Sequence, residues 1–372
     1  MDSNDPSFWV NRVQPQEIPA IAMDLFKIGK AFHLQGSPGT GKTYIGEVVA
    51  ELLAERFGLK LVKNQMRWDK GEFGLIQANM SHYESEDWMM PLINPKTSKY
   101  ERTATSVLPV NDNGLFQIDE IAKKPETFRF VAQLMNEGRI GFDYFLPKNT
   151  YCMSTSNYTS DRAGAHHLHT DLINRMAIIN VHPTAEGFCK HHGGELAPDI
   201  MGFLKWFPDK ILTFNPKDVG EPFASPRSIF AVSQLLDTGF DPNNATNPNA
   251  YKVLRSLVGE AFTNEFQAVL RASMSLGDVD DMIKDPEGSR NKIEKLREDS
   301  SNARSQLCSL TMMLAKRCKR DASNFGDIIR LLHKIDDESA VVFTHMALQV
   351  NPKVKEQPEF AEHYERNQGF YF

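Results

Sequence analysis

The segment that most constrains this chain is Gly36-Ser37-Pro38-Gly39-Thr40-Gly41-Lys42-Thr43. It matches the pattern of a glycine, any four residues, and then Gly-Lys-Ser/Thr. In this pattern the glycines let consecutive backbone N–H groups converge on phosphate oxygens. Lys42 is expected to reach the β- and γ-phosphates, and Thr43 to ligate Mg²⁺. We therefore predict that these eight residues form a phosphate-binding loop.

The segments on either side of this loop have the expected periodicity. Residues 31 to 34 form a short apolar run typical of a buried strand, and apolar residues then recur at helical spacing as far as Gly58. A helix that begins inside the loop directs its positive N-terminal end at bound phosphate. We also expect a helix between residues 13 and 30 and a second strand at residues 60 to 63.

A second group of candidate residues follows a predicted strand at residues 114 to 118, which ends in Asp119 and Glu120. Asp119 can hold Mg²⁺ through its water shell, and Glu120 can orient and polarise the water that attacks a γ-phosphate. An Asp-Glu pair after an apolar strand is common, and by itself often marks only a strand end. Downstream of a phosphate loop, the pair predicts hydrolysis of ATP.

The chain then continues to alternate between helices and strands. A helix is predicted from Pro125 to Gly138, followed by a hairpin whose arms are residues 139 to 144 and 148 to 154. Asn157 then lies at the end of a strand. A short helix capped at Thr170-Asp171 and a strand at residues 177 to 181 follow. This alternation predicts a parallel sheet covered on both faces.

Residues 64 to 113 show little regular periodicity, and we interpret them as an insertion in this α/β domain. Its aromatic residues, Trp68 and Phe73 in particular, could form a mobile loop that grips a partner. Packing as a cover over the core is the favoured interpretation for any single aromatic side chain.

From residue 184 onward the pattern is helical only. Ser225-Pro226 is a strong helix start, and further helices are predicted from Tyr251 to Leu270 and from Asn291 to Arg317. The expected domains are an α/β nucleotide-binding domain at residues 1–183, an α-helical lid domain at 184–348 and a weakly ordered tail at 349–372.

Several short motifs together resemble the AAA+ ATPases, and most closely the MoxR-like branch. In chain order they are Gly-Ser-Pro-Gly-Thr-Gly-Lys-Thr, Leu-Phe-Gln-Ile-Asp-Glu, Ser-Thr-Ser-Asn, Asn-Arg-Met and Ser-Pro-Arg-Ser. The resemblance covers roughly residues 15 to 275. It implies the parallel sheet of a P-loop NTPase, the AAA+ core, followed by an all-α lid domain.

The resemblance also implies roles for three further residues. Asn157 resembles the sensor 1 asparagine that helps position the attacking water, and Arg175 resembles the arginine finger that reaches a neighbouring subunit's γ-phosphate. Arg227 resembles the sensor 2 arginine of the lid. The structural alternatives are a strand-end cap for Asn157, a surface salt bridge for Arg175 and a solvent-facing helix start for Arg227.

By the same resemblance, the ligands are ATP and Mg²⁺ and the assembly is a ring, commonly a hexamer, with ATP sites between subunits. MoxR-like ATPases remodel or activate protein partners in a chaperone-like manner, often beside a protein with a von Willebrand A-type domain. The sequence does not name the protein substrate.

Two other functions remain open within the same fold. A formal net charge of -6 argues against general nucleic-acid binding, so a motor or loader acting on nucleic acid is the alternative rather than the main prediction. The other alternative is an ATP-dependent binding switch with little turnover. Glu120 argues against a switch, because a pure switch has little use for a water-activating carboxylate.

The remaining sequence signals predict a cytoplasmic protein. No apolar run resembles a secretion signal or a membrane-spanning segment, and the four cysteines are scattered, as expected for free thiols in a reducing compartment. A zinc site is a minor alternative, because the histidines nearest Cys189 lack defined ligand spacing. These histidines are His166, His167, His169, His182, His191 and His192.

Overall fold

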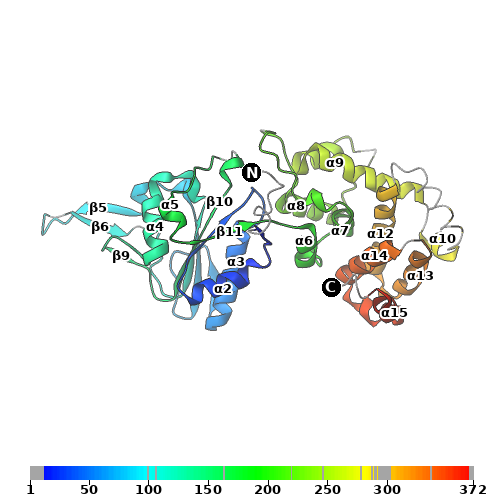
Figure 1. Cartoon of the computed structure of the whole chain (residues 1–372), viewed down its shortest axis with the longest axis horizontal. Coiled ribbons are helices and arrows are strands. Elements are labelled where there is room, and N and C mark those ends of the chain that lie inside the picture. Colours follow the sequence, from blue (N-terminus) through cyan, green and yellow to red (C-terminus); the bar gives the residue numbers. More distant parts are fainter. Residues whose placement is uncertain are drawn as a thin grey trace. The chain divides into compact units, whose positions relative to one another are not determined.

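The chain folds into two compact units, which we describe separately (Figure 1). Unit 1 extends to Pro183 and includes Asn215–Lys217, and unit 2 comprises Thr184–Phe214 and the chain from Asp218 onward. The computed structural model describes residues 12–98, 100–104, 107–161, 164–218, 220–244, 247–276, 279–285, 288, 291, 303–335 and 337–367.

Unit 1 is built on a seven-stranded parallel sheet. Because the strands are parallel, the carboxyl ends of its central strands meet at one edge, where ligands bind in open α/β sheets. This architecture confirms the predicted P-loop NTPase sheet. In spatial order the strands are β1 (Arg12–Val13), β11 (Ala177–Val181), β2 (Phe32–Gln35), β10 (Thr150–Ser156), β7 (Gly114–Asp119), β4 (Glu72–Asn79) and β3 (Lys60–Lys63).

Helices cover both faces of this sheet (Figure 1). Helices α2 (Ile18–Lys27) and α3 (Lys42–Phe57) pack on one face, and α4 (Phe128–Glu137) and α5 (Thr170–Ile173) pack on the other. Strand β7 contributes to both cores, with Leu115 on the α3 face and Phe116 on the α4 face. Side chains alternate along a strand, so Gln117 and Asp119 lie on the α3 face.

The prediction of an irregular insertion over residues 64–113 is wrong in the first half of that segment. Residues Glu72–Asn79 form β4, which pairs in parallel with both β3 and β7. Phe73 is fully buried on this strand and Trp68 is buried beside it, so the hypothesis of a mobile gripping loop is also wrong for both residues. A strand buried on both faces lacks a polar–apolar alternation, so the sequence pattern did not indicate that these residues form a strand. A separate antiparallel pair, β5 (Met89–Ile93) and β6 (Tyr100–Ala104), follows.

The predicted hairpin before Asn157 is also different in the structure. The hairpin consists only of β8 (Arg139–Ile140) and β9 (Tyr144–Phe145), which pair antiparallel. The segment expected as its second arm is β10, which joins the main sheet between β2 and β7. Burial of β10 against two parallel neighbours outweighs local pairing.

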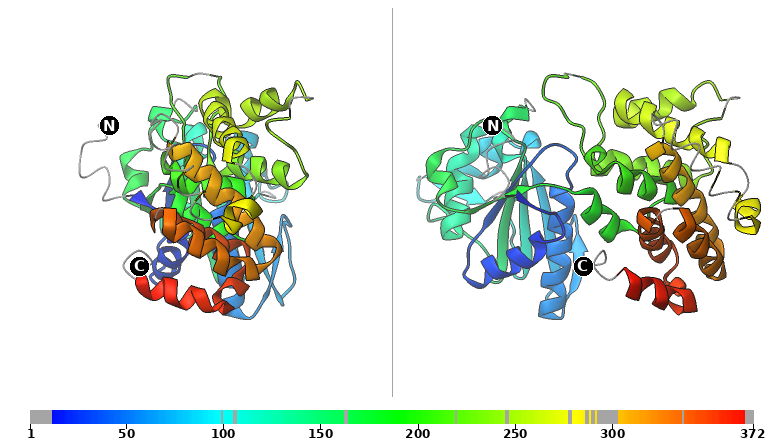
Figure 2. Two further views of the ribbon diagram at one scale, coloured as in Figure 1. Left: turned by 90° about the vertical axis from the view of Figure 1, so that its right-hand side faces the viewer. Right: turned by 45° about the vertical axis from the view of Figure 1, so that its right-hand side comes forward.

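Unit 2 is helical (Figure 2). Its core contains a cluster of stacked and edge-on rings formed by Phe203, Phe207, Phe262 and Phe266. The helices are α6 (Ala185–His192), α7 (Pro198–Trp206), α8 (Pro226–Asp237), α9 (Ala250–Leu276), α10 (Val279–Lys284), α12 (Ala303–Arg320), α13 (Phe325–Ile335), α14 (Asp337–Val350) and α15 (Pro358–Arg366).

Local signals explain two of these helices. A capping box formed by Ser225 and Ser228 starts α8, as the Ser-Pro signal predicts. Helix α9 covers the predicted segment but is interrupted at Gly259, whose φ of 79° is non-helical. Part of the helix predicted from Asn291 to Arg317 lies outside the described residues, and α12 forms its C-terminal portion.

The prediction of a weakly ordered tail from residue 349 is wrong for the described residues up to Asn367. Val354 is fully buried, and α15 packs on α13, where His363 approaches His333 at 2.9 Å between ring nitrogens. The prediction relied on the polar composition of this segment and overlooked its few buried apolar residues, such as Val354. None of the helices in the described part of the chain has the length and apolar character needed to cross a membrane.

Candidate functional site

The predicted phosphate loop connects the end of β2 to the start of α3. Gly36 is required by close packing, since a Cβ there would lie 2.9 Å from the Val181 carbonyl oxygen on β11. Gly41 precedes α3 with a φ of 87°, in the left-handed region that favours glycine. The loop therefore has the backbone path that its glycines predict, at the N-terminus of a 16-residue helix.

The Lys42 ammonium group lies inside this loop. Its Nζ donates to the carbonyl oxygens of Gly36 at 2.6 Å and Ser37 at 2.8 Å. It also donates to Asn157 Oδ1 at 3.0 Å. Asn157 follows β10 directly, so the sheet brings it to the loop from 115 residues away. The two residues are close enough to contact the same phosphate.

The two residues predicted to bind Mg²⁺, Thr43 and Asp119, also meet at this edge. The Asp119 carboxylate accepts hydrogen bonds from Gln117 Nε2 at 2.8 Å, from Thr155 Oγ1 at 2.9 Å and from Thr43. Burial raises the pKa of Asp119, and these hydrogen bonds oppose that rise. A buried carboxylate beside a hydroxyl oxygen is a donor set that fits Mg²⁺.

Glu120 occupies a strained backbone position, with a φ of 58°. Its Oε2 accepts from Ser81 Oγ at 2.9 Å and forms an ion pair with Lys123 Nζ at 2.6 Å. Burial acts to raise the pKa of Glu120, but the hydrogen bonds from Lys123 and Ser81 outweigh it, so the pKa is lowered. The carboxylate is therefore ionised at neutral pH and can act as an acceptor.

Sequence reasoning missed a histidine beneath the loop. His33 on β2 is fully buried, with Nδ1 2.8 Å from Ser154 Oγ and Nε2 2.9 Å from Ser156 Oγ on β10. Burial, together with the nearby Lys42 charge, lowers the pKa of His33 to about 3. The ring is neutral and links the two strands that lead into the loop and to Asn157. The signal available in the sequence was a histidine inside the otherwise apolar run of residues 31 to 34.

Two glutamines on adjacent strands were also missed. Gln77 on β4 pairs with Gln117 on β7 in register, and both amides reach the Thr43 carbonyl oxygen. Gln117 is fully buried. Its position within the apolar run Leu-Phe-Gln-Ile was visible in the sequence, but only the strand order shows what it contacts.

Asp161 is a further buried carboxylate near the loop, four residues after Asn157. It accepts a hydrogen bond from Ser37, and its Oδ2 has no hydrogen-bond partner among the described residues. Burial raises its pKa, and Ser37 and the Lys42 charge act against that rise.

The two predicted arginines belong to different units. Arg175 is half-buried and lies two residues before β11, whose first residue, Ala177, pairs with Phe32 at the start of β2. The phosphate loop begins at the other end of β2. Arg227 belongs to unit 2, where it is exposed in the first turn of α8.

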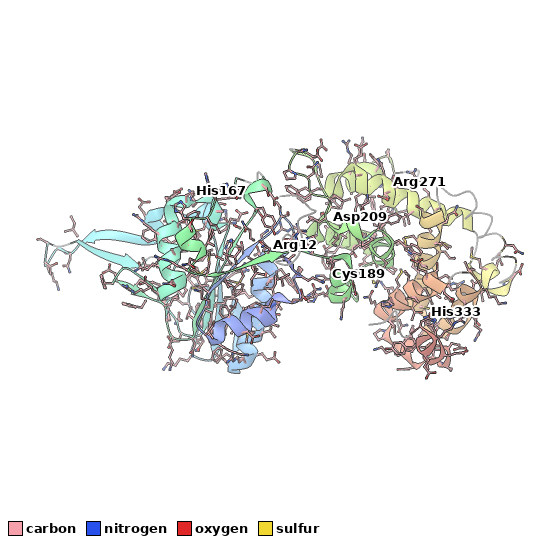
Figure 3. The ribbon with its side chains drawn as sticks, in the orientation of Figure 1. Arg12, His167, Cys189, Asp209, Arg271 and His333 are labelled. Carbon is pink, nitrogen blue, oxygen red and sulfur yellow. The ribbon has the colours of Figure 1, made fainter. Side chains whose placement is uncertain are left out.

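The histidines considered for zinc are divided between the units. His166, His167, His169 and His182 belong to unit 1, whereas Cys189, His191 and His192 belong to unit 2. Figure 3 labels one residue of each group, His167 and Cys189. Within the described part of the chain, no three His, Cys, Asp or Glu side chains form a group that could hold a metal ion.

No family model matches this sequence, and no curated protein matches it. Solved structures with similar arrangements include an unconfirmed ATPase from Cytophaga hutchinsonii, at 11% identity and a TM-score of 0.31, covering 94% of this chain and 88% of that one. NtrX from Brucella abortus in complex with ATP is 13% identical with a TM-score of 0.37, covering 87% of this chain and 68% of that one. Its ADP complex is 15% identical with a TM-score of 0.37, covering 86% and 67%.

Proposed function

We propose that this chain is an AAA+ ATPase that binds Mg²⁺-ATP at the carboxyl edge of the unit 1 sheet and hydrolyses it. The observation that carries the proposal is the convergence of three separate segments. Lys42 hydrogen-bonds Asn157, and Thr43 hydrogen-bonds Asp119, within one strand edge. Phosphate, metal and water could thus be held together, as phosphoryl transfer requires.

The chain's own groups divide the work in this proposal. The backbone N–H groups of residues 36 to 43 and the N-terminus of α3 bind the phosphates, and Lys42 exchanges its carbonyl partners for phosphate oxygens. Thr43 and Asp119 would hold Mg²⁺, which when bound would offset the negative charge that develops on the phosphate oxygens.

Glu120 and Asn157 act on the attacking water. Glu120 is ionised and lies one residue beyond Asp119, so it can accept a proton from water beside the γ-phosphate. Its present contacts, with Ser81 and Lys123, must loosen for that role. Asn157, held by Lys42, orients the same water through its side-chain amide.

Arg175 fits a role in a neighbouring subunit better than one in its own. Residues along a strand are spaced by about 3.3 Å, so the length of β2 separates its start from the phosphate loop at its end. Arg175 lies beyond the start of β2. An arginine at that end points to a ring in which each subunit completes the next one's site. Within this proposal, Arg227 senses the nucleotide from a helical lid formed by unit 2.

The MoxR-like motifs extend the proposal to the work performed. We infer a ring, commonly hexameric in this family, that uses ATP to remodel or activate a protein partner in a chaperone-like manner. A protein with a von Willebrand A-type domain is a candidate for that partner. The features supporting this inference are the Ser-Pro-Arg segment and the hairpin that precedes Ser-Thr-Ser-Asn.

The test of hydrolysis uses Glu120→Gln, with Lys42→Ala as the binding-deficient control. Glu120→Gln is expected to bind ATP with wild-type affinity and to release phosphate at least about 100-fold more slowly, because the proton acceptor is lost. Lys42→Ala is expected to bind no ATP. Steady-state phosphate release and titration of a fluorescent ATP analogue measure the two properties. Undiminished turnover in Glu120→Gln would remove Glu120 from catalysis.

The test of shared sites mixes two inactive variants. Arg175→Ala lacks the finger and Lys42→Ala lacks the phosphate lysine, so a mixed ring contains some sites with both residues intact. We expect partial recovery of phosphate release on mixing, and none from either variant alone. If every mixing ratio stays inactive, Arg175 does not act across a subunit interface.

A further inference from the structure

We propose that Gln117, supported by Gln77, is a positioning residue for the metal site. It fixes the Asp119 carboxylate and the Thr43 backbone relative to one another, so that the two Mg²⁺ ligands are held in place before the metal arrives. This inference rests on the proposed function. It adds two glutamines on neighbouring strands to the residues expected from the sequence motifs.

The hydrogen bonds of Gln117 carry the inference. Its Nε2 donates to Asp119 Oδ1 at 2.8 Å and to the Thr43 carbonyl oxygen at 3.2 Å. One amide nitrogen has two hydrogens, so both are used, one on each segment that supplies a metal ligand. Gln117 therefore connects the end of β7 to the first turn of α3.

Gln77 fixes the orientation of that amide. Its Nε2 donates to Gln117 Oε1 at 3.2 Å and to the Thr43 carbonyl oxygen at 3.4 Å. Rotating the Gln117 amide by half a turn would place its oxygen against the Asp119 carboxylate and its nitrogen against the Gln77 nitrogen. Both contacts would be repulsive, so the network permits one orientation.

Burying a polar side chain such as that of Gln117 costs free energy, so packing alone does not explain a glutamine at this position. Gln117 is fully buried, with a relative exposure of 0%. Its strand neighbours Leu115 and Ile118 are apolar, and an apolar residue would fill the position without any polar group to satisfy. A glutamine here is explained by what its amide holds.

Helix α3 is shaped to receive the glutamine. A Cβ built on Gly46 would overlap the Gln117 side-chain amide, and the nearest atoms it would meet all belong to Gln117. Gly46 lies in the second turn of a helix and costs stability relative to alanine. The missing side chain leaves the space in which the amide reaches Thr43.

The inference can be tested by measuring how much Mg²⁺ strengthens nucleotide binding. The dissociation constant of a fluorescent, non-hydrolysable ATP analogue is measured in saturating Mg²⁺ and in EDTA, and the ratio gives the metal contribution. In Gln117→Met we expect this contribution to fall about 10-fold while affinity in EDTA stays at the wild-type value, because side chains that hydrogen-bond metal ligands have effects of this order. Gln77→Met is expected to lower it less.

Phe116→Leu is the matched control, since it changes the same strand on its opposite face. It is expected to lower thermal stability and to keep the wild-type metal contribution. A wild-type metal contribution in Gln117→Met would overturn this inference and leave the proposed function standing. If the wild-type protein binds no nucleotide, the proposed function fails, and this inference fails with it.

Gly46→Ala tests the same contact without altering Gln117. Its new methyl group should displace the amide and lower the metal contribution as Gln117→Met does. In a Gln117→Ala background, adding Gly46→Ala should cause no further loss, because the group that it would displace is gone. An equal further loss in that background would overturn the inference.

Discussion

Comparing buried polar side chains in the helical core of unit 2 and at the strand edge of unit 1 separates two kinds of hydrogen bond, one that returns to the same helix and one that reaches another segment. In unit 2, Thr263 and Thr344 are fully buried, and each donates to the carbonyl oxygen four residues earlier on its own helix. In unit 1, the buried Thr155, His33 and Gln117 bond to other strands or loops.

This difference separates packing from positioning. The hydroxyl of a threonine that donates to its own helix has a hydrogen-bond partner wherever the helix lies, so this bond does not fix the helix relative to another segment. Side chains that bond across strands hold two segments in a fixed relation, and in unit 1 both Thr155 and Gln117 bond Asp119. We therefore expect substitutions in the two regions to affect different properties.

The largest expected effect on stability is in the apolar core of unit 2. Phe203→Ala removes a fully buried ring that packs against three other phenylalanines, and should cost about 3–5 kcal/mol of unfolding free energy. Urea unfolding measures the loss. Below the transition, nucleotide affinity in EDTA should be unchanged; weakened affinity would show that the unit 2 core and the loop are not independent.

A matched pair of threonines tests the comparison directly. Thr155→Val removes one of the donors to Asp119 and leaves the Glu120 N–H without its acceptor at 3.3 Å, and should cost about 1–3 kcal/mol. Thr344→Val removes only a bond to a helix carbonyl and should cost less than about 1 kcal/mol. Equal losses in urea unfolding would contradict the distinction between the two regions.

The smallest expected effect is a pH dependence from His33. Its folded pKa of about 3 lies below the usual value, so as pH falls the unfolded chain takes up the proton first. The free energy of unfolding is therefore highest, with respect to His33, above about pH 6.5. It decreases below that pH, by about 1 kcal/mol between about pH 7 and pH 5.5.

His33→Gln should be less sensitive to pH over this window, because glutamine does not titrate. Comparing the two proteins by urea unfolding cancels the contribution of the carboxylates, which both retain. Identical pH slopes would mean that the His33 ring does not remain neutral in the folded protein.

Local sequence signals predicted the elements that carry the phosphate loop. The strand before Gly36, the helix that ends at Gly58 and the strand ending in Asp119 are all present. They were predictable because each has a strong local cause, namely helical periodicity, a left-handed glycine or an apolar run. Predictions failed where long-range pairing decides, as for β4 within residues 64–113 and for β10.

By itself, the sequence determined which residues could contact phosphate, metal and water, because the Gly-Lys-Thr and Asp-Glu motifs have little other use in this order. Only the tertiary structure decided which buried polar groups support them. Gln77 lies outside the motifs, and Gln117 and Thr155 lie within motifs that assign them no role, but the parallel strand order β10-β7-β4 makes the three residues neighbours. Hydrogen bonding between strands depends on register, which no local pattern encodes.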